Sequence, residues 1–408
     1  MEQLSFSTPS SRICIISILL DLPAKSLLRF KCVSKAWHRL ISHPKFQEKH
    51  YARRASVPRF FFQCSDFDYD QSSGTARQRF AILNSAGVPL DVLRVNAVGG
   101  PIKLVLLSSR GLLCFATETC VYLCNTATRS LIQLPPPHGV DRQGNPLTIS
   151  GFGYMESAGE YKVARVVHKP WLGDHSPCKL ECSVFTYSVS AQPPAAAAND
   201  GKLLADTCPY FVNEVSLPVF ARGTESIYWK IVQNRHCLCH STAQARPDVF
   251  LAYLDVKKER FGVVRWPQGL RRPNPSVGDW REAGEIPLRI MESKLAGSVE
   301  KLSMIETPED LPLRLVVWLL TDQENSHWVR QAVVSLPLFD DGTILGEIKE
   351  YRSDLIIYSS PYKVIIFINP ENGTFRKVRI PANLRSLDFC TYTENLLTLQ
   401  LPPNQGGN

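Results

Sequence analysis

The spacing of apolar residues changes near Pro58, and this change restricts the possible folds more than any other feature of the sequence. Before Pro58, apolar residues recur every three or four positions, as on one face of a helix. After Pro58 they alternate with polar residues or form runs of four to six, which is typical of short strands. The 29 Pro and 23 Gly residues also argue against long helices. The sequence therefore predicts a helical module at 11–50 and a mainly β domain at 56–400, between a disordered leader (1–10) and a disordered tail (401–408).

Three short helices are predicted in the N-terminal module. The first ends at Leu22-Pro23, and Pro23 suits the first turn of a second helix that reaches Phe30. Ser34 is a good N-cap for a third helix, which His43-Pro44 is predicted to end. So small a unit has too little interior for its many apolar side chains. We therefore expect a partner protein to cover some of them.

A hairpin pattern recurs three times in the β-rich part. The second strand of each hairpin opens with an apolar residue six positions after a turn Asn or Asp, and a fixed offset of this kind sets which face each side chain occupies. Repeated hairpins of short strands predict a β-propeller-like domain of six to eight four-stranded blades. The three pairs are Asn125 with Leu131, Asp255 with Phe261, and Asn369 with Phe375.

The net charge of +8 is concentrated at the N-terminus. Residues 1–58 contain ten Lys and Arg but only three acidic residues, whereas the rest of the chain is nearly neutral. Such a field attracts an acidic partner, either protein or nucleic acid. Because the basic residues are interleaved with the apolar helical pattern, nucleic-acid binding is the weaker of the two interpretations.

Cysteine use and hydropathy indicate a reducing compartment. Twelve Cys in a chain of 408 residues are not the density of a disulfide scaffold, and Cys114, Cys124 and Cys182 lie in apolar runs, where a thiol packs as a small hydrophobic group. The apolar stretch Ile13–Leu20 is far too short to span a bilayer. Glu2 and the charged approach at Asp21 disfavour a secretory leader. We expect a location in the cytoplasm, the nucleus or both, without membrane association.

The segment Leu22–His50 resembles the second half of a plant F-box. In that family the F-box docks on a Skp-type adaptor, which connects it to a cullin, and the resemblance implies that this module does the same. The matching positions are Leu22, Pro23, Lys25, Ser26, Leu27, Leu28, Phe30, Cys32, Val33, Ser34, Lys35, Trp37, Leu40, Ile41, Pro44 and Phe46. The adaptor-binding residues expected on this basis are Ile18, Leu19, Leu22, Pro23, Leu27, Leu28, Phe30, Val33, Trp37, Leu40 and Ile41.

The β-rich part resembles the F-box-associated β-propeller domain of the same plant families. The resemblance implies the substrate-recognition subunit of a Skp–cullin–F-box ubiquitin ligase. Such a subunit does no chemistry and acts by bringing a protein substrate close to a ubiquitin-charged enzyme. The matching pieces are Gly111–Phe115, Cys124–Pro137, Gly151–Val166, Pro218–Trp229, Leu251–Phe261 and Tyr392–Leu399.

The first helix departs from the family pattern. The family usually opens its F-box with Leu-Pro and an acidic pair, but this chain has Ser10-Ser11-Arg12-Ile13, and Ser17 stands where another acidic residue is usual. This part is therefore basic where the family is acidic, which puts adaptor docking in doubt. The alternative function is a binding module that uses its propeller without an adaptor.

No constellation of residues predicts catalysis, a metal site or a cofactor. The cluster His236–His240 has Cys residues only one position apart and no second ligand pair, which is poor spacing for zinc. No phosphate loop or nucleophile elbow occurs. Trp280 lies in a polar segment, and Arg271 and Arg272 near it would suit an acidic or phosphorylated partner. These three residues are the predicted substrate site.

Overall fold

A computed structural model describes most of the helical and strand segments of the chain. The described residues are 9–55, 57, 59–70, 72–73, 75–98, 103–117, 120–134, 149–168, 180–189, 201–206, 218–231, 249–268, 289–293, 301–306, 314–335, 347–351, 354–359, 363–369 and 372–400. The predicted tail and most of the predicted leader lie outside these ranges, as do nearly all of the two segments 192–201 and 268–284.

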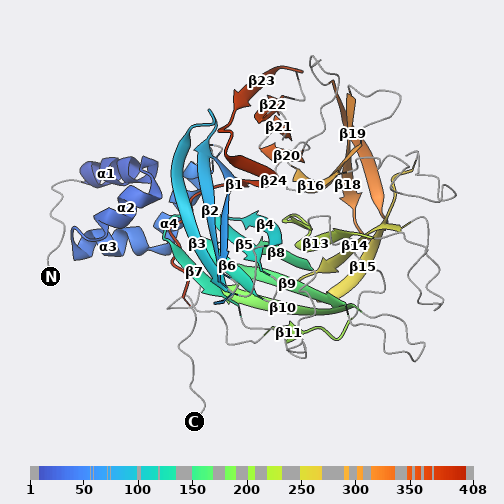
Figure 1. Ribbon diagram of the computed structural model, residues 1–408, viewed down its shortest axis with the longest axis horizontal. Helices are drawn as coiled ribbons and strands as arrows, with labels where there is room; N and C mark the ends of the chain where they lie inside the picture. The colour runs from blue at the N-terminus through green and yellow to red at the C-terminus, as the bar shows by residue number, and fades with distance from the viewer. Residues whose placement is uncertain are drawn as a thin grey trace, which may run out of the picture. The chain divides into compact units, whose positions relative to one another are not determined.

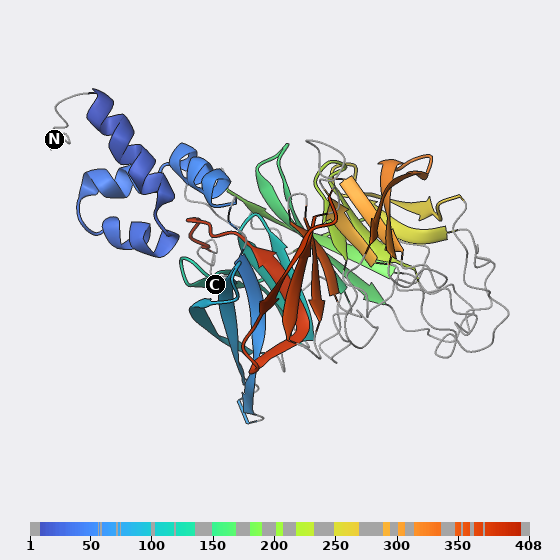
Figure 2. The same ribbon diagram turned by 90° about the horizontal axis from the view of Figure 1, so that it is seen from above.

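Four helices form the N-terminal module, one more than predicted (Figure 2). Pro44 does not only end the third helix, because it also occupies the first turn of a fourth, where the missing N–H of proline costs nothing. The predicted break at Leu22-Pro23 and the predicted cap are confirmed, since Ser34 Oγ accepts a hydrogen bond of 3.2 Å from Trp37 N. The helices are α1 (Pro9–Asp21), α2 (Ala24–Phe30), α3 (Lys35–Ser42) and α4 (Pro44–Arg54).

The remainder forms antiparallel sheets, six of them within the described residues, each of four strands (Figure 1). The first contains β24 (Leu384–Tyr392), β1 (Arg59–Asp70), β2 (Thr75–Asn84) and β3 (Pro89–Val98) in that order. The second contains β4 (Lys103–Ser109), β5 (Leu112–Ala116), β6 (Val121–Asn125) and β7 (Ser130–Gln133). The third contains β8 (Ile149–Met155), β9 (Glu160–His168), β10 (Leu180–Ser188) and β11 (Lys202–Leu203).

The other three sheets have the same layout. The fourth contains β12 (Val219–Ala221), β13 (Ser226–Lys230), β14 (Val249–Asp255) and β15 (Arg260–Arg265). The fifth contains β16 (Arg289–Ser293), β17 (Lys301–Glu306), β18 (Arg314–Asp322) and β19 (His327–Ser335). The sixth contains β20 (Glu347–Tyr351), β21 (Asp354–Ser359), β22 (Val364–Ile368) and β23 (Phe375–Arg379).

The first sheet differs from the others because it combines the two ends of the β-rich region. The other five described sheets are each built from four consecutive strands, whereas here β24 lies beside β1, with Arg59 opposite Tyr392 and Phe61 opposite Cys390. Repeated four-stranded antiparallel sheets are the blade pattern of a β-propeller. The prediction of a mainly β chain with a small helical module is confirmed.

The recurring hairpin of the sequence has the same register in all three places. The residue before the turn Asn or Asp pairs with the apolar residue that opens the next strand, and the turn side chain accepts a hydrogen bond from a backbone N–H two or three residues on, as Asn and Asp do in tight turns. The cross-strand pairs are Cys124–Leu131, Leu254–Phe261 and Ile368–Phe375. The acceptors are Asn125, Asp255 and Asn369.

These turns end in a left-handed residue. The fourth position after the turn Asn or Asp has a positive φ of 58° at Arg129, 53° at Glu259 and 68° at Gly373. A turn that contains a residue with positive φ has a backbone twist that matches the right-handed twist of the two strands it connects. The shared geometry explains why the sequence offset is the same in hairpins far apart in the chain.

The chain divides into two compact units, each with its own core. One unit comprises Met1–Leu134, Tyr187–Ala198 and Pro381–Asn408, and the other Pro135–Thr186 and Asn199–Ile380. In the first unit, aromatic rings fill the sheet interior, with Phe61 stacked on Phe80 at 5.0 Å between centroids. In the second, Trp229, Trp266 and Trp328 are buried.

Three cysteines of the apolar runs lie in the interior. Cys114, Cys124 and Cys182 are buried, consistent with their predicted role as small apolar groups. None of the helices in the described part of the chain has the length and apolar character needed to cross a bilayer.

Candidate partner-binding surface of the helical module

The helical module has a compact apolar core. Leu27 and Ile41 are fully buried and Leu19 is only 2% exposed. All three belong to the predicted adaptor-binding set, and in this structure they pack in the core that holds the helices together. The whole core consists of Leu19, Leu20, Ala24, Leu27, Ile41, Phe46 and Leu396.

One member of this core comes from the other end of the chain. Leu396 lies in the segment 393–400, which follows the last strand, and is 1% exposed. Asn125 holds this segment, since its Nδ2 donates to the carbonyl oxygens of Asn395 (3.0 Å) and Leu397 (2.6 Å). The chain itself therefore covers part of the apolar surface that we expected a partner to cover. No local pattern in the sequence signals this contact.

Buried charges connect helix α4 to the first sheet. Glu394 Oε2 accepts a hydrogen bond of 2.7 Å from Arg59 Nη1 on β1, and Glu394 Oε1 lies 2.5 Å from Arg54 Nε at the end of α4. The second contact is an ion pair without the alignment of a hydrogen bond. All three side chains are largely shielded from solvent. One carboxylate therefore joins the helical module to the sheet.

His50 supports the break between α1 and α2. Its Nε2 lies 2.9 Å from the carbonyl oxygen of Leu22, the residue before Pro23, and the side chain is fully buried. Burial lowers the pKa of His50, because the charged ring loses solvation, and this outweighs the Leu22 carbonyl and Glu394, which raise it. The lowered pKa favours the neutral form of the His50 ring over the charged form at neutral pH.

Part of the predicted adaptor-binding set remains accessible. Ile18 is 62% exposed, Val33 is 66% exposed, and Pro23 is also exposed. A contiguous patch of exposed aliphatic side chains marks a surface that a partner covers, whereas single exposed ones are ordinary on protein surfaces. Phe30 and Trp37 meet edge to face with centroids 5.4 Å apart. The half-buried members of the set are Leu22, Leu28, Phe30, Trp37 and Leu40.

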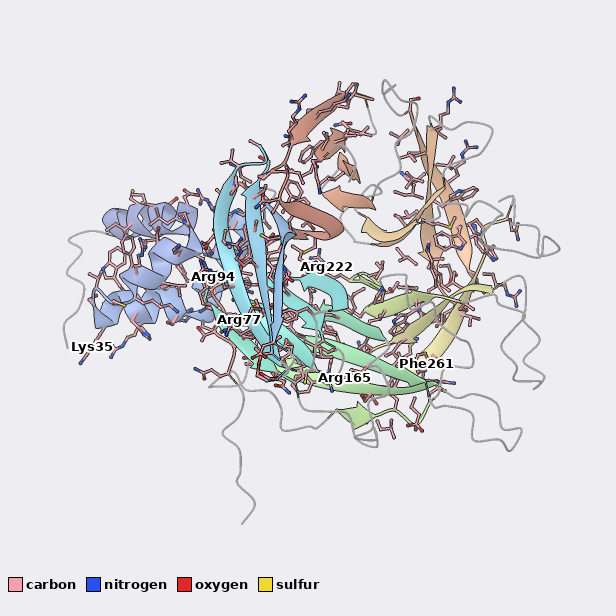
Figure 3. The ribbon with its side chains drawn as sticks, in the orientation of Figure 1. Lys35, Arg77, Arg94, Arg165, Arg222 and Phe261 are labelled. Carbon is pink, nitrogen blue, oxygen red and sulfur yellow. The ribbon has the colours of Figure 1, made fainter. Side chains whose placement is uncertain are left out.

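A shallow basic depression is lined by residues that flank Val33 in the sequence. Burial lowers the pKa of Lys31, and Lys35 lies at the start of α3 (Figure 3). None of the described residues that line the depression is acidic, so the depression suits an acidic partner. Lys25, outside the depression, lies 3.9 Å from Asp91 of the same chain. The lining residues are Lys31, Cys32, Ser34, Lys35, His38 and Arg39.

The other features singled out in the sequence are helix α1, the predicted substrate site and a possible metal site. Helix α1 forms over Pro9–Asp21 although its first turn contains no acidic residue. Trp280, Arg271 and Arg272, like the cluster at 236–240, lie outside the described residues. Within the described part of the chain, no group of three or more His, Cys, Asp or Glu side chains is arranged to hold a metal ion.

Comparison with known proteins identifies the helical module. The family profile of the F-box domain matches residues 12–49. An F-box/LRR-repeat protein of Arabidopsis thaliana is 24% identical over 95% of this chain and 82% of its own length. The F-box protein CPR1 of Arabidopsis thaliana is 26% identical over 64% of this chain and 60% of its own length. Another Arabidopsis thaliana F-box protein is 31% identical over 163 residues, and this chain covers 45% of its length.

Solved structures that align with the chain are distant. AztD from Citrobacter koseri aligns with 82% of this chain and 97% of its own, with 8% identity and a TM-score of 0.37. The β-propeller domain of Cps50 (Swd1) from Myceliophteria thermophila aligns with 78% of this chain and 86% of its own, with 8% identity and a TM-score of 0.35. TM-scores this low do not define a common fold.

Proposed function

We propose that this chain is the substrate-recognition subunit of a Skp–cullin–F-box ubiquitin ligase. The F-box domain at 12–49 docks on a Skp-type adaptor, and the β-rich domain binds a protein substrate. The observation that carries the proposal is the match of residues 12–49 to the F-box domain, and the exposed Ile18 and Val33 on that module are consistent with it.

The accessible apolar residues support adaptor docking. Burying an aliphatic side chain of this size contributes about 1.5–3 kcal/mol. Pro23 and the half-buried Trp37 extend the set, and tryptophan is enriched at interface hot spots. The basic depression at Lys31 and Lys35 adds attraction for an acidic adaptor surface. A cullin joins the assembly through the adaptor.

The connection between module and sheet supports the proximity mechanism. Leu396 in the helical core and Glu394 between Arg54 and Arg59 join the F-box to the first sheet within one compact unit. A substrate held by that sheet would stay close to the adaptor, which raises the effective concentration of its lysines near the ubiquitin-charged enzyme. The chain itself contributes binding and no catalytic group.

The β-rich part is, in this proposal, an F-box-associated propeller. Its blades would include the six described sheets, the first of which pairs β24 with β1.

Co-purification with a Skp adaptor tests the proposal. We expect the full-length chain to retain the adaptor, the double substitution Leu22→Ala/Pro23→Ala to lose most of it, and Leu203→Ala, at an exposed leucine of β11, to retain it fully. Absence of the adaptor from the wild-type preparation, with the chain folded, would overturn the proposal. The alternative function, a binding module that acts without an adaptor, would then be favoured.

A further inference from the structure

The chain that follows the last strand forms a strap between the F-box and the second sheet. This C-terminal strap comprises residues 393–400 and belongs to none of the six described sheets. Side chains of the β6–β7 hairpin hold its backbone. Thr128 Oγ1 donates to the carbonyl oxygen of Leu397 at 3.1 Å, and Ser130 Oγ accepts from Leu399 N at 3.1 Å. Because single hydrogen bonds of this kind contribute little net stability, the strap can detach without breaking a strand pairing.

Asn125 has two roles at the start of the turn in this hairpin. Its Oδ1 accepts a hydrogen bond of 3.0 Å from Ala127 N, which shapes the turn. Its Nδ2 donates to the carbonyl oxygens of Asn395 and Leu397 in the strap. The matching turn position of the fourth sheet is Asp255, whose carboxylate makes the same turn contact but has no N–H to donate. An amide at position 125 is therefore needed for the strap and not for the turn.

The strap also completes the F-box core. Leu396 is 1% exposed and shares this core with Leu19 and Phe46. Ala127, in the turn that Asn125 shapes, packs against the same core. A helical module this small has little interior of its own, so the loss of one buried leucine opens a large part of it.

The turn between β4 and β5 contacts both the strap and the F-box. Asn395 Nδ2 donates to the carbonyl oxygen of Arg110 at 2.9 Å, and the Arg110 guanidinium lies 3.6 Å from Glu48 of helix α4. The next residue, Gly111, has a φ of 82°. A Cβ at this position would lie 2.6 Å from Asn395 Cβ and 2.7 Å from the carbonyl oxygen of Thr393. Glycine therefore permits the close approach of the strap to this turn.

We propose that the C-terminal strap is an intramolecular partner that completes the F-box core and thereby sets its affinity for the adaptor, with Asn125 as the positioning residue. The adaptor part rests on the proposed function, whereas closure of the core does not. A bound strap preorganises the helices, and the apparent affinity for a ligand is proportional to the fraction of molecules in the binding-competent conformation. Adaptor and strap therefore favour each other, because both bind the closed module.

Hydrogen exchange of the full-length chain, followed by mass spectrometry, tests the closure. Asn125→Asp keeps the turn acceptor and removes the strap donor, so the amides of α1–α4 should exchange about tenfold or more faster than in the wild type. Amides of the fifth sheet should not change. The control Asn369→Asp places the same substitution at the matching turn of the sixth sheet and should leave α1–α4 as in the wild type. Equal protection of the helices in Asn125→Asp and the wild type overturns the proposal.

A milder variant excludes general unfolding as the cause. Leu396→Ala leaves the hydrogen bonds of the strap in place and shortens its apolar contact with the module. The amides of α1–α4 should then exchange faster while those of β1–β3 stay protected. Equal acceleration in α1–α4 and in β1–β3 would show that module and sheet open as one unit, which overturns the separate role of the strap.

Adaptor affinity tests the coupling. We expect Asn125→Asp to bind a purified Skp adaptor about tenfold more weakly than the wild type, and saturating adaptor to slow exchange of the strap amides in the wild type. Asn369→Asp should bind as the wild type does. Equal adaptor affinity of Asn125→Asp and the wild type overturns the coupling. A folded wild type that binds no adaptor contradicts the proposed function instead, and the exchange experiment still decides whether the strap closes the core.

Discussion

Arg59 donates a hydrogen bond of 2.7 Å to Glu394, a residue 335 positions away in the sequence. Arg59 begins the first strand of the β-rich part, and Glu394 follows its last strand. The same carboxylate meets Arg54 at the end of helix α4. One side chain therefore joins the F-box module and both ends of the composite first sheet.

Replacing Glu394 with Gln should destabilise this junction. The substitution leaves Arg54 and Arg59 shielded without their counter-charge, and breaking a buried ion pair costs about 3–5 kcal/mol. We expect a lower melting temperature and faster tryptic cleavage at Arg54. The control Glu324→Gln changes an exposed carboxylate paired with Lys258, where a surface ion pair contributes little to stability. Equal melting temperatures for the two variants would contradict this account.

Stability should depend on His50 below neutral pH. Burial places the folded-state pKa of His50 below the usual value of 6.5, so the unfolded chain takes up this proton first as the pH falls. The stability is therefore fully present above 6.5 and is lost as the pH falls from 6.5 towards the folded-state pKa. Melting temperatures at a series of pH values should fall more steeply for the wild type than for His50→Gln. Parallel curves would show that His50 does not contribute.

Leu27 and Val33 should separate folding from docking. Leu27→Ala creates a cavity in the helical core and should cost about 2–5 kcal/mol. Leu203→Ala, at an exposed leucine, should cost less than about 0.5 kcal/mol. Val33→Asp should leave the melting temperature nearly unchanged, because Val33 is mostly in solvent. A melting temperature of Leu27→Ala equal to that of the wild type would mean that Leu27 is not a core residue.

Gly373 tests the shared turn geometry. Its φ of 68° is unfavourable for a residue with a Cβ, although no atom lies within 4 Å of where a Cβ would stand. Gly373→Ala should therefore cost about 1 kcal/mol through backbone strain alone. Gly373→Asn should cost less, because Asn tolerates the left-handed region. Chemical denaturation of both variants measures the difference, and an Ala variant as stable as the Asn variant would contradict the turn assignment.

Local signals predicted local structure well. Leu22-Pro23 ended α1, Ser34 capped α3, and the six-residue offset after Asn125 gave the correct hairpin register. Pro44 was misinterpreted because proline stops one helix and begins another equally well.

The site depends on contacts that no local pattern contains. Leu27 and Val33 are both apolar residues of one short module, and only the packing of Leu396 and the helices shows that the first is buried and the second exposed. Arg79 and Arg94 become neighbours through the β2–β3 register, in which the pairing shifts between Ile82 and Leu83. Neither the burial of Leu27 nor the Arg79–Arg94 pairing can be predicted from neighbouring residues in the sequence.

The affinity of the purified chain for a purified Skp adaptor tests the central claim most directly. We predict measurable binding by the wild type, binding weakened about tenfold or more by Val33→Asp, and unchanged binding by Val333→Asp, a matched substitution at an exposed valine of β19. No binding by the folded wild type, or equal affinity for the two variants, would contradict it.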